Sequence, residues 1–442
     1  MKINKKQYYF LGICGVSMSG IAKLLSDQGH GVRGSDLRKC DLGNKIDIYH
    51  GHNMHQIDKS IDELIYTSAA ENKKAPGYVE LQKARSINIK TTKRSKFIGK
   101  IMNDKYGIAI TGMHGKTTVS TMVSLILEEF GFDPICLIGS YVKEWGSNVR
   151  NGNPVKTKNN RLRQYFLTEA CEYDRQMLDF RPQVALITNM DEEHLDTYKN
   201  GMKDIRQAFK KFVKLLPKNG LLVLCKDDKN VASLTKYAKC KVKYYSYKEP
   251  WPGLKLKVSG KHNLQNATGA ARLSHELGVD HKTITKVLNG FTGAARRCEI
   301  KGEKRRLLVI DDYGHHPTEI KATLKGIKEK YPDKKLIVVY QPHQQQRTKL
   351  LFNDFVKSFD VADEIIINKV YLIAGREKES KNNLAKLLAD KLNQRGKKAI
   401  YLDTYSQIGD YVKGFLGKDS VLLTMGATDI YKVGNMILNV KK

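Results

Sequence analysis

The sequence predicts a three-domain α/β protein in which each domain is built on a parallel sheet. Its 442 residues exceed one ordinary core, and roughly 150 residues per domain gives about three domains. Short apolar runs alternate with segments of helical periodicity, which is typical of parallel sheets with crossover helices. Glycine-rich turns also join a strand to a helix at two places. We expect domains at residues 1–100, 101–298 and 299–442.

Residues 5–30 predict a strand, a glycine turn and a helix. The turn does not match the dinucleotide fingerprint, because Cys14 occupies the place of the second glycine, and this disfavours a nicotinamide-dependent oxidoreductase. The next strand ends at Ser35 and Asp36, where an acidic residue suits ribose hydroxyls. A third strand at 64–70 runs into small residues that leave room for a ligand. The pattern indicates a small Rossmann-like domain.

Residues 106–130 carry the strongest functional signal in the chain. An apolar run ends at Thr111, and a helix face repeats from Val119 onwards. Between them, GMHGKTT at 112–118 is a turn that aims backbone N–H groups and a helix dipole at one point. The common phosphate-loop pattern fails, since Ile110 stands in the place of its first glycine. The shorter turn is similar to that of Mur ligases and folylpolyglutamate synthetases, and it predicts an ATP phosphate cradle.

Polar residues follow two later strands of the central domain. Glu169 ends the apolar run at 165–169, and His194 lies shortly after the run at 184–190. Because carboxyl ends of parallel strands meet at one edge of a sheet, we expect both to reach a divalent ion beside the ATP phosphates. A helix that begins after Gly260 carries Asn263 and Asn266, whose amides suit adenine, although Asn263 is equally suited to an N-cap.

The last domain repeats the strand and helix alternation. Its five apolar runs lie at 307–311, 336–340, 364–367, 399–402 and 421–425. They predict another parallel sheet. Polar clusters follow four of these runs, at 311–319, 341–348, 374–377 and 425–429, and together they predict a ligand-facing edge. Residues 290–297 are interpreted as a linker and residues 151–163 as a flexible polar loop.

Composition narrows the function classes. Hydrophobic residues make up 41% and charged residues 28%, which is typical of a soluble globular protein. No apolar run approaches the roughly 18 residues that a membrane helix needs. No signal peptide is apparent. We therefore expect a cytoplasmic protein without a membrane partner. Seven scattered cysteines without a C-x-x-C pair favour reduced thiols over zinc or disulfides.

The net charge of +31 raises the alternative of a nucleic-acid-binding ATPase. The basic residues are spread over the whole chain, and no nucleic-acid-binding motif accompanies them. A general bias toward lysine, which also attracts polyanionic nucleotides, is the favoured interpretation. We therefore expect no nucleic-acid partner.

Nine motifs follow one another in the order found in Mur ligases. They are GICGVSMSGIA, TGMHGKTT, EACEYDRQML, NMDEEHLD, GKHNLQNA, AARR, DDYGHHPTE, QPHQQQRT and MGATD. On these motifs the chain resembles the Mur ligase family over essentially its whole length. The resemblance implies a Rossmann-like N-terminal domain for a UDP-sugar, a central P-loop ATPase-like domain and a Rossmann-like C-terminal domain.

The resemblance also implies roles for individual residues. The UDP-sugar would be held by Gly12, Ser17, Met18, Ser19, Gly20, Ser35, Asp36 and Ser68. ATP would be held by Gly112, Met113, His114, Gly115, Lys116, Thr117 and Thr118, with Asn263 and Asn266 at the adenine. Mg²⁺ would be bound by Thr117 and Glu169, and a second Mg²⁺ by His194. The third domain would bring Arg297 and Asp312 to the nucleotide, and His316, His343 and Arg347 to the muramoyl carboxylate and sugar phosphates. Catalysis would rest on Lys116, Glu169, His194, Arg297 and His316.

The implied activity is the ATP-dependent joining of L-alanine to the lactyl carboxylate of UDP-N-acetylmuramate through an acyl phosphate, with closure of the third domain during turnover. The expected assembly is a monomer or homodimer. Two alternatives stay open: a murein-recycling ligase that joins a peptide to the same UDP-sugar, and a nucleotide-binding protein without catalysis. Gln344, where arginine is frequent, and Thr428, in place of a glycine, depart from the family pattern. The departure at Gln344 bears on the identity of the substrate but not on the reaction class.

Overall fold

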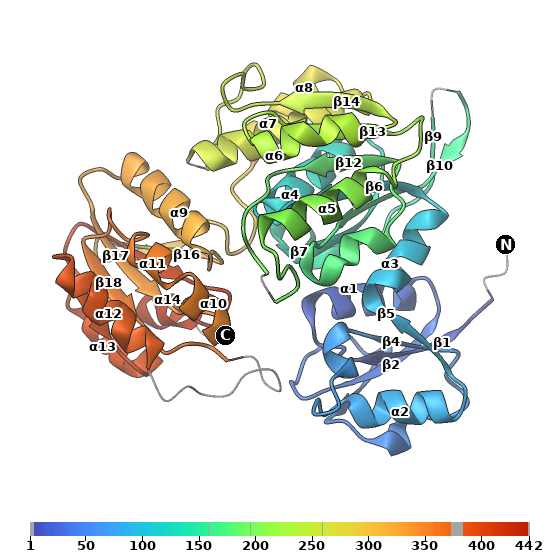
Figure 1. Ribbon diagram of the computed structural model, residues 1–442, viewed down its shortest axis with the longest axis horizontal. Helices are drawn as coiled ribbons and strands as arrows, with labels where there is room; N and C mark the ends of the chain where they lie inside the picture. Colours follow the sequence, from blue (N-terminus) through green and yellow to red (C-terminus); the bar gives the residue numbers. More distant parts are fainter. Residues whose placement is uncertain (1–3, 158, 195, 259, 373–382, 441–442) are drawn as a thin grey trace. The chain divides into compact units, whose positions relative to one another are not determined.

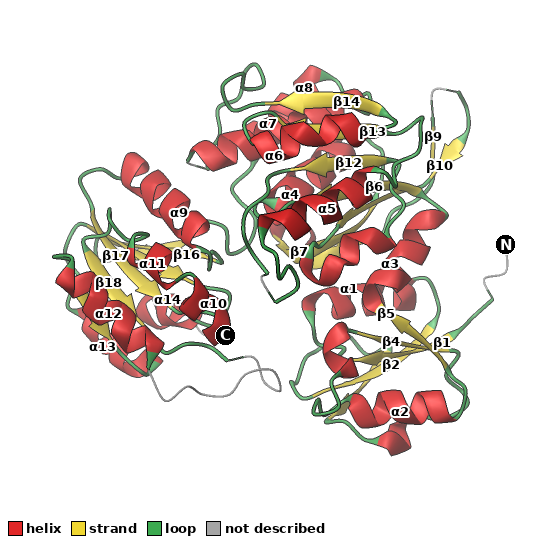
Figure 2. Ribbon diagram, in the orientation of Figure 1, coloured by secondary structure: helices red, strands yellow, loops and turns green. Residues whose placement is uncertain are grey.

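The computed structural model describes residues 4–157, 159–194, 196–258, 260–372 and 383–440. These residues form sheets of five, seven and six strands and one two-stranded ladder (Figures 1 and 2). The chain divides into two compact units, Met1–Leu254 with Gln265–Asn289 and Lys255–Leu264 with Gly290–Lys442. The predicted α/β class with three sheets is confirmed, whereas the domain boundaries near residues 100 and 298 stay predictions. None of the described helices is long and apolar enough to cross a membrane.

The N-terminal sheet is entirely parallel, with the strand order β3-β2-β1-β4-β5. Its elements are β1 (Gln7–Leu11), α1 (Val16–Asp27), β2 (Gly31–Asp36), β3 (Ile46–His50), η1 (Met54–Gln56), β4 (Glu63–Tyr66), η2 (Ser68–Glu71), α2 (Tyr78–Ser86), β5 (Lys90–Lys93) and α3 (Arg94–Asn103). The predicted strand, turn and helix at 5–30 are confirmed by β1 and α1. The predicted strand at 64–70 is too long, because β4 ends at Tyr66 and a 3₁₀ turn follows. The two edge strands β3 and β5 were not predicted, since they are polar and lack an apolar run.

The expectation of reduced cysteines is wrong for one pair. Cys14 and Cys40 form a disulfide with Cα atoms 5.7 Å apart, while the other five cysteines are free. The two residues are 26 positions apart in sequence. They meet because β1 and β2 are parallel neighbours that end at the same edge of the sheet. Sequence spacing alone does not reveal this proximity.

The central sheet has the order β14-β13-β12-β6-β11-β7-β8, and its pairs are parallel except for the edge pair of β7 and β8. Its strands are β6 (Tyr106–Thr111), β7 (Ile135–Val142), β8 (Ser147–Arg150), β11 (Tyr165–Glu169), β12 (Val184–Ile187), β13 (Leu221–Cys225) and β14 (Lys241–Tyr245). The helices of this part are α4 (Lys116–Glu129), α5 (Met202–Val213), α6 (Lys229–Ala232), α7 (Lys261–Glu276) and α8 (His281–Gly290), with 3₁₀ turns η3 (Lys143–Trp145), η4 (Tyr173–Asp179) and η5 (Ser233–Tyr237). The predicted loop at 151–163 contains a short antiparallel ladder of β9 (Val155–Lys156) and β10 (Leu162–Arg163). The central strand β6 ends at the glycine turn, which places that turn at the middle of the sheet's carboxyl edge.

The third sheet has the order β15-β16-β20-β17-β18-β19 and is parallel except for the edge pair of β15 and β16. Its elements are β15 (Glu299–Lys304), β16 (Leu307–Asp312), α9 (Pro317–Lys330), β17 (Lys335–Tyr340), α10 (Gln345–Leu350), α11 (Phe352–Val356), β18 (Glu364–Ile367), α12 (Leu384–Gln394), β19 (Ala399–Tyr401), α13 (Tyr405–Lys413), β20 (Ser420–Met425) and α14 (Tyr431–Leu438). All five predicted strands are confirmed within one residue at either end. The antiparallel edge strand β15 was missed, because its sequence EIKGEK has no apolar run. The predicted polar cluster at 374–377 lies outside the described residues.

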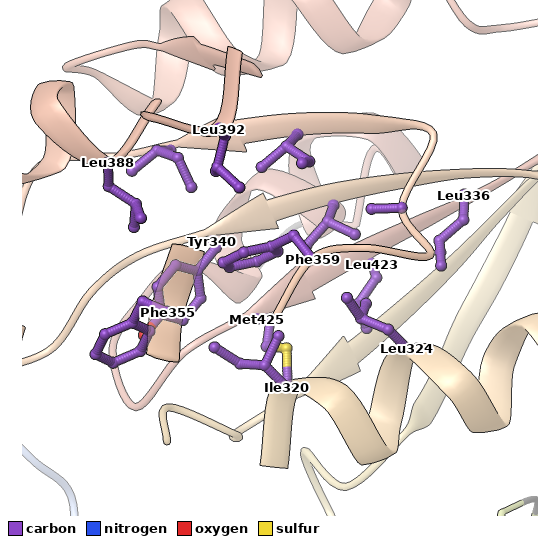
Figure 3. Close-up of a cluster of buried hydrophobic side chains, with 14 of the residues drawn as sticks. Ile320, Leu324, Leu336, Tyr340, Phe355, Phe359, Leu388, Leu392, Leu423 and Met425 are labelled. Atoms are coloured by element: carbon purple, nitrogen blue, oxygen red, sulfur yellow. The ribbon is translucent and has the colours of Figure 1, made fainter. Parts of the chain in front are cut away.

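Alternate residues of these strands supply two separate cores, one on each face of the sheet. Leu336, Val338 and Tyr340 belong to the cluster packed against α9, α11 and α12, whereas Ile337 and Val339 belong to the cluster packed against α13 and α14. Figure 3 shows the first cluster, in which Ile320 and Leu324 of α9 lie next to Met425 and Leu423 of β20. Because these strands are buried on both faces, their sequences are continuous apolar runs.

Replacing Leu423 by alanine is expected to lower the free energy of unfolding by about 3 kcal/mol, because it leaves a cavity on a central strand. Leu423 is 0% exposed and lies between β16 and β17. Leu387, which is 43% exposed on α12, supplies the matched control. Chemical unfolding of both alanine variants, followed by circular dichroism, checks this result. Equal losses in the two variants would contradict the assigned core.

Candidate active site at the phosphate loop

The glycine turn after β6 is held in one conformation by the loop after β12. The backbone N–H of His114 donates to Asn189 Oδ1 at 2.8 Å, and Thr188 Oγ1 donates to the His114 carbonyl at 2.7 Å. Two glycines are required here: Gly112 (φ +130°) would place a Cβ 2.0 Å from Thr188 Oγ1, and Gly115 (φ +82°) caps α4. Helix α4 therefore begins directly at Lys116, and the N–H groups of its first turn have no partner within the helix. This is the arrangement that binds phosphate groups, and we name residues 112–118 the phosphate loop.

Lys116 is buried beside a carboxylate that the sequence analysis did not assign. Its Nζ donates to the carbonyl oxygens of Gly112 at 2.7 Å and Met113 at 2.8 Å, and it lies 2.9 Å from Glu172 Oε2. Burial by itself would lower the pKa of Lys116, but the charge of Glu172 outweighs it and raises the pKa above the ordinary lysine value. The ammonium group is therefore charged and is aimed at the turn.

Glu172 also orients His194. Its Oε1 lies 3.0 Å from His194 Nε2, and its side chain is only 2% exposed. Burial would raise the pKa of Glu172, but the nearby Lys116 and His194 lower it below the ordinary value. His194 itself has a left-handed backbone (φ 56°), which is unusual for a residue other than glycine and is typical of functional loops. Glu172 thus joins two of the predicted catalytic residues.

Glu169 lies apart from this pair, beside Thr117. Its Oε2 accepts from Thr117 Oγ1 at 3.1 Å, and its Oε1 accepts from the backbone N–H of Gly139 at 2.7 Å. The structure therefore brings Thr117 and Glu169 together, while it pairs His194 with Glu172 rather than with Glu169. The signal for Glu172 was present in the sequence, since Glu169 ends β11 and Glu172 follows three residues later, but their spacing gave no reason to prefer one partner for His194.

Two groups of this edge fit a divalent cation. Glu172, Glu193 and His194 offer ligand atoms within 4.8 Å of one another. Thr117 and Glu169 offer a second set of oxygen atoms next to the phosphate loop. Hard cations such as Mg²⁺ prefer oxygen ligands and share them with substrate phosphates, so the hydroxyl and carboxylate oxygens at this edge fit Mg²⁺.

The predicted adenine residues occupy different units. Asn266 is 8% exposed, and a Cβ built on Gly115 would lie 2.6 Å from its Oδ1, so this amide packs directly against the phosphate loop. Asn263 is 6% exposed in the first turn of α7 and belongs to the second unit.

The predicted UDP-sugar residues gather at the carboxyl ends of β1, β2 and β4. The backbone N–H groups of Gly12 and Ile13 donate to the Ser35 carbonyl, and the Cys14 N–H donates to Asp36 Oδ2 at 2.9 Å. Ser17 and Ser19 lie at the start of α1, where Ser19 Oγ donates to the Val16 carbonyl. Met18 and Gly20 are buried in the packing of α1, and Ser68 Oγ donates to Asp174.

A buried hydrogen-bond network next to the glycine turn after β1 was not predicted from the sequence. Glu80, which is 0% exposed, accepts from Ser35 Oγ at 2.6 Å and from Tyr9 Oη at 3.1 Å, and it lies 3.1 Å from His52 Nδ1. The Ser35 hydroxyl is therefore engaged inside the domain. The backbone carbonyl is the group of Ser35 that accepts from the glycine turn in the described hydrogen bonds.

In the second unit, the predicted residues form two groups at the carboxyl ends of β16 and β17. Glu319 accepts from the backbone N–H groups of His315 and His316 and lies 3.7 Å from Arg297 Nη1. Asp312 accepts from the N–H groups of Cys298 and Gly314, and burial raises its pKa. His316 caps α9 through Nδ1.

The second of these groups follows β17. Arg347 Nη1 lies 3.4 Å from His343 Nδ1, and His343 stacks on Tyr371. Gln344 has a left-handed backbone (φ 70°) and caps α10, and Thr428 Oγ1 donates to Gln341. Both departures from the family pattern thus lie at this polar edge.

Three family models match consecutive parts of the chain. They are described as the Mur ligase family catalytic domain (residues 7–106), the Mur ligase middle domain (110–252) and the Mur ligase glutamate ligase domain (296–428). A UDP-N-acetylmuramate–L-alanine ligase of Caldanaerobacter subterraneus is 37% identical, over 99% of this chain and 98% of its own length. Another, from Clostridium acetobutylicum, is 39% identical over 98% of each chain. The chain belongs to the Mur ligase family.

Solved structures share the fold of this Mur ligase. The UDP-N-acetylmuramate-alanine ligase MurC of Thermotoga maritima matches with a TM-score of 0.81 at 24% identity, over 98% of both chains. A murein peptide ligase of Psychrobacter arcticus matches with a TM-score of 0.72 at 21% identity, also over 98% of both chains. The three-domain Mur ligase architecture predicted from the sequence is thereby confirmed.

Proposed function

We propose that this Mur ligase joins L-alanine to the lactyl carboxylate of UDP-N-acetylmuramate and converts ATP to ADP and phosphate, as a cytoplasmic step of peptidoglycan synthesis. The observation that carries the reaction type is the phosphate loop, where a buried, charged Lys116 lies between the turn carbonyls and Glu172. The choice of L-alanine is supported by relatives of this name that are 37–39% identical over nearly the whole chain.

In the first half-reaction, an oxygen of the lactyl carboxylate attacks the γ-phosphorus of ATP in line, and the bond to the β-phosphate oxygen breaks. Charge then spreads over the transferring phosphoryl oxygens, and positioned cations stabilise it. We assign this work to Lys116 and to the N–H groups at the start of α4. Mg²⁺ held by Thr117, Glu169 and the His194 edge would supply further positive charge to the phosphates.

In the second half-reaction, the amine of L-alanine attacks the activated carbonyl, and phosphate leaves with the oxygen that came from the carboxylate. The developing oxyanion requires nearby positive charge. Glu172 keeps Lys116 and His194 in place, since it contacts both side chains while it is shielded from water. We therefore assign Glu172 a positioning role in the site.

Phosphate release from ATP in the presence of Mg²⁺ and UDP-N-acetylmuramate tests this function. We expect release with L-alanine and not with the tripeptide of the recycling ligases; glycine and L-serine measure the tolerance of the acceptor site. Preference for the tripeptide would instead identify a murein peptide ligase. The absence of acceptor-dependent release would contradict the ligase proposal and favour a nucleotide-binding protein without catalysis.

A further inference from the structure

The Cys14–Cys40 disulfide lies at the predicted UDP-sugar site and not in a remote part of the domain. Cys14 is part of the glycine turn after β1, and Cys40 comes four residues after β2 ends at Asp36. Ligands of open parallel sheets bind outside the carboxyl ends of the strands. The disulfide therefore joins the two segments that leave the sheet where a nucleotide is expected to enter.

The glycine turn is fixed without the help of this disulfide. The N–H groups of Gly12 and Ile13 donate to the Ser35 carbonyl at 2.8 and 3.1 Å, and that of Cys14 donates to Asp36 Oδ2 at 2.9 Å. These bonds anchor the turn to the end of β2. The disulfide therefore restrains the segment that follows β2 rather than the glycine turn.

Residues 37–45, which we name the β2 segment, contain neither helix nor strand and are mostly exposed. Their hydrogen bonds are local: Arg38 N–H donates to Asp36 Oδ1, Gly43 N–H donates to Asp41 Oδ1, and Ile46 N–H donates to the Gly43 carbonyl. One contact does reach the glycine turn: Cys14 Sγ, itself part of the disulfide, lies 3.4 Å from the Arg38 carbonyl oxygen. The disulfide is the covalent tether that holds Cys40 against the turn.

We propose that Cys14 and Cys40 form a redox modification site, in which the disulfide holds the β2 segment over the glycine turn and weakens binding of the UDP-sugar, and reduction releases it. The inference rests on the proposed function, because it assigns the UDP-sugar to this edge. It adds a modification to that site and concerns two residues outside the phosphate loop.

The chemistry needs a low-molecular-weight disulfide as the oxidant. One cysteine thiolate attacks a sulfur of that disulfide, which gives a mixed disulfide and releases one small thiol. The second cysteine thiolate attacks the protein sulfur of the mixed disulfide, closes the Cys14–Cys40 bond and releases the second small thiol. The two electrons pass to the oxidant, and the two protons lost by the cysteines end on the released thiols.

The other cysteines are poorer partners for this exchange. Burial raises the pKa of all five free thiols, and it raises that of Cys171 to about 12. Thiolate, the attacking form, is therefore scarce at those positions. Cys14 and Cys40 are both partly exposed and lie close enough together to form the disulfide.

The test compares the intact chain after treatment with dithiothreitol and with glutathione disulfide. Isothermal titration with UDP-N-acetylmuramate is expected to give at least a tenfold higher Kd for the oxidised chain, and dithiothreitol should restore the lower value. Cys40→Ser should bind like the reduced chain under both conditions, whereas the control Cys240→Ser should respond like the wild type. Equal affinities of the two forms, with the disulfide verified by peptide mass spectrometry, would overturn the proposal, as would failure of glutathione disulfide to form this bond.

A second readout separates this site from the proposed function. Arg38 and Lys39 are exposed trypsin sites in the β2 segment. They should be cleaved faster in the reduced chain and in Cys40→Ser than in the oxidised chain. A redox-dependent cleavage rate without UDP-sugar binding in either form would contradict the proposed function and the ligand part of this inference. Redox-independent cleavage would contradict the tether itself.

Discussion

Replacing Lys116 by alanine is expected to reduce the rate of phosphate release roughly a thousand-fold or more, while the affinity for UDP-N-acetylmuramate stays unchanged. Lys116 Nζ is the buried cation of the phosphate loop, only 2.9 Å from Glu172, whereas most of the residues predicted to hold the UDP-sugar lie in the separate N-terminal sheet and the segments that follow its strands. Steady-state phosphate release and isothermal titration with the UDP-sugar measure the two quantities. Turnover at the wild-type rate would show that the phosphate loop has been assigned wrongly.

The same variant is expected to lose stability, and this loss must be separated from the loss of catalysis. Removal of Lys116 takes the lysine counter-ion from the buried Glu172, whose side chain is 2% exposed, and breaking a buried ion pair in this way costs about 3–5 kcal/mol. The double variant Lys116→Met with Glu172→Gln removes both charges. It should regain most of the wild-type free energy of unfolding but none of the phosphate release. Recovery of turnover in the double variant would mean that Lys116 is structural and not catalytic.

Replacing Glu172 by glutamine is expected to lower the rate of phosphate release about a hundred-fold and the free energy of unfolding by about 3 kcal/mol. The substitution leaves the buried ammonium group of Lys116 without its counter-ion and puts a neutral amide in place of the carboxylate beside His194. Because the neighbours lower the pKa of Glu172 in the folded chain, its stabilising contribution is present above the ordinary glutamate pKa. That contribution is lost as the pH falls through the depressed folded-state pKa, so the stability difference between wild type and variant should shrink in acid.

Glu192→Gln is the matched control for this experiment. Glu192 is an exposed residue of the same loop as His194, and its carboxylate accepts only from a backbone N–H of α5 in the described hydrogen bonds. We expect near wild-type turnover and a stability change within about 0.5 kcal/mol, apart from the weakened cap of α5. A loss of turnover as large as that of Glu172→Gln would show that the effect follows the loop and not the buried pair.

Those parts of the fold that bury an apolar face could be predicted from the sequence. The strands β16, β17, β18 and β20 are covered on both sides, so their sequences are continuous apolar runs. The edge strands β3, β5 and β15 were missed, because half of their surface faces water and charged residues are tolerated there.

The candidate site was predicted less completely than the fold. The phosphate loop could be predicted from local sequence, because its glycines and Lys116 all lie within one turn of the chain. The buried carboxylates of the two sites come from distant segments: Glu172, the partner of Lys116, lies after β11, and Glu80, the partner of Ser35, lies on α2. A single sequence shows that these carboxylates exist but not which cation or hydroxyl each one meets. The Cys14–Cys40 pair was missed for the same reason.

The most direct test of the proposed activity follows an oxygen atom through one reaction. UDP-N-acetylmuramate labelled with ¹⁸O in its lactyl carboxylate is incubated with the chain, ATP, Mg²⁺ and L-alanine, and the products are analysed by mass spectrometry. We predict UDP-N-acetylmuramoyl-L-alanine together with phosphate that carries one ¹⁸O atom from the carboxylate. Phosphate without the label would contradict the acyl phosphate, and no amide product with L-alanine would contradict the assignment of this Mur ligase as the L-alanine enzyme.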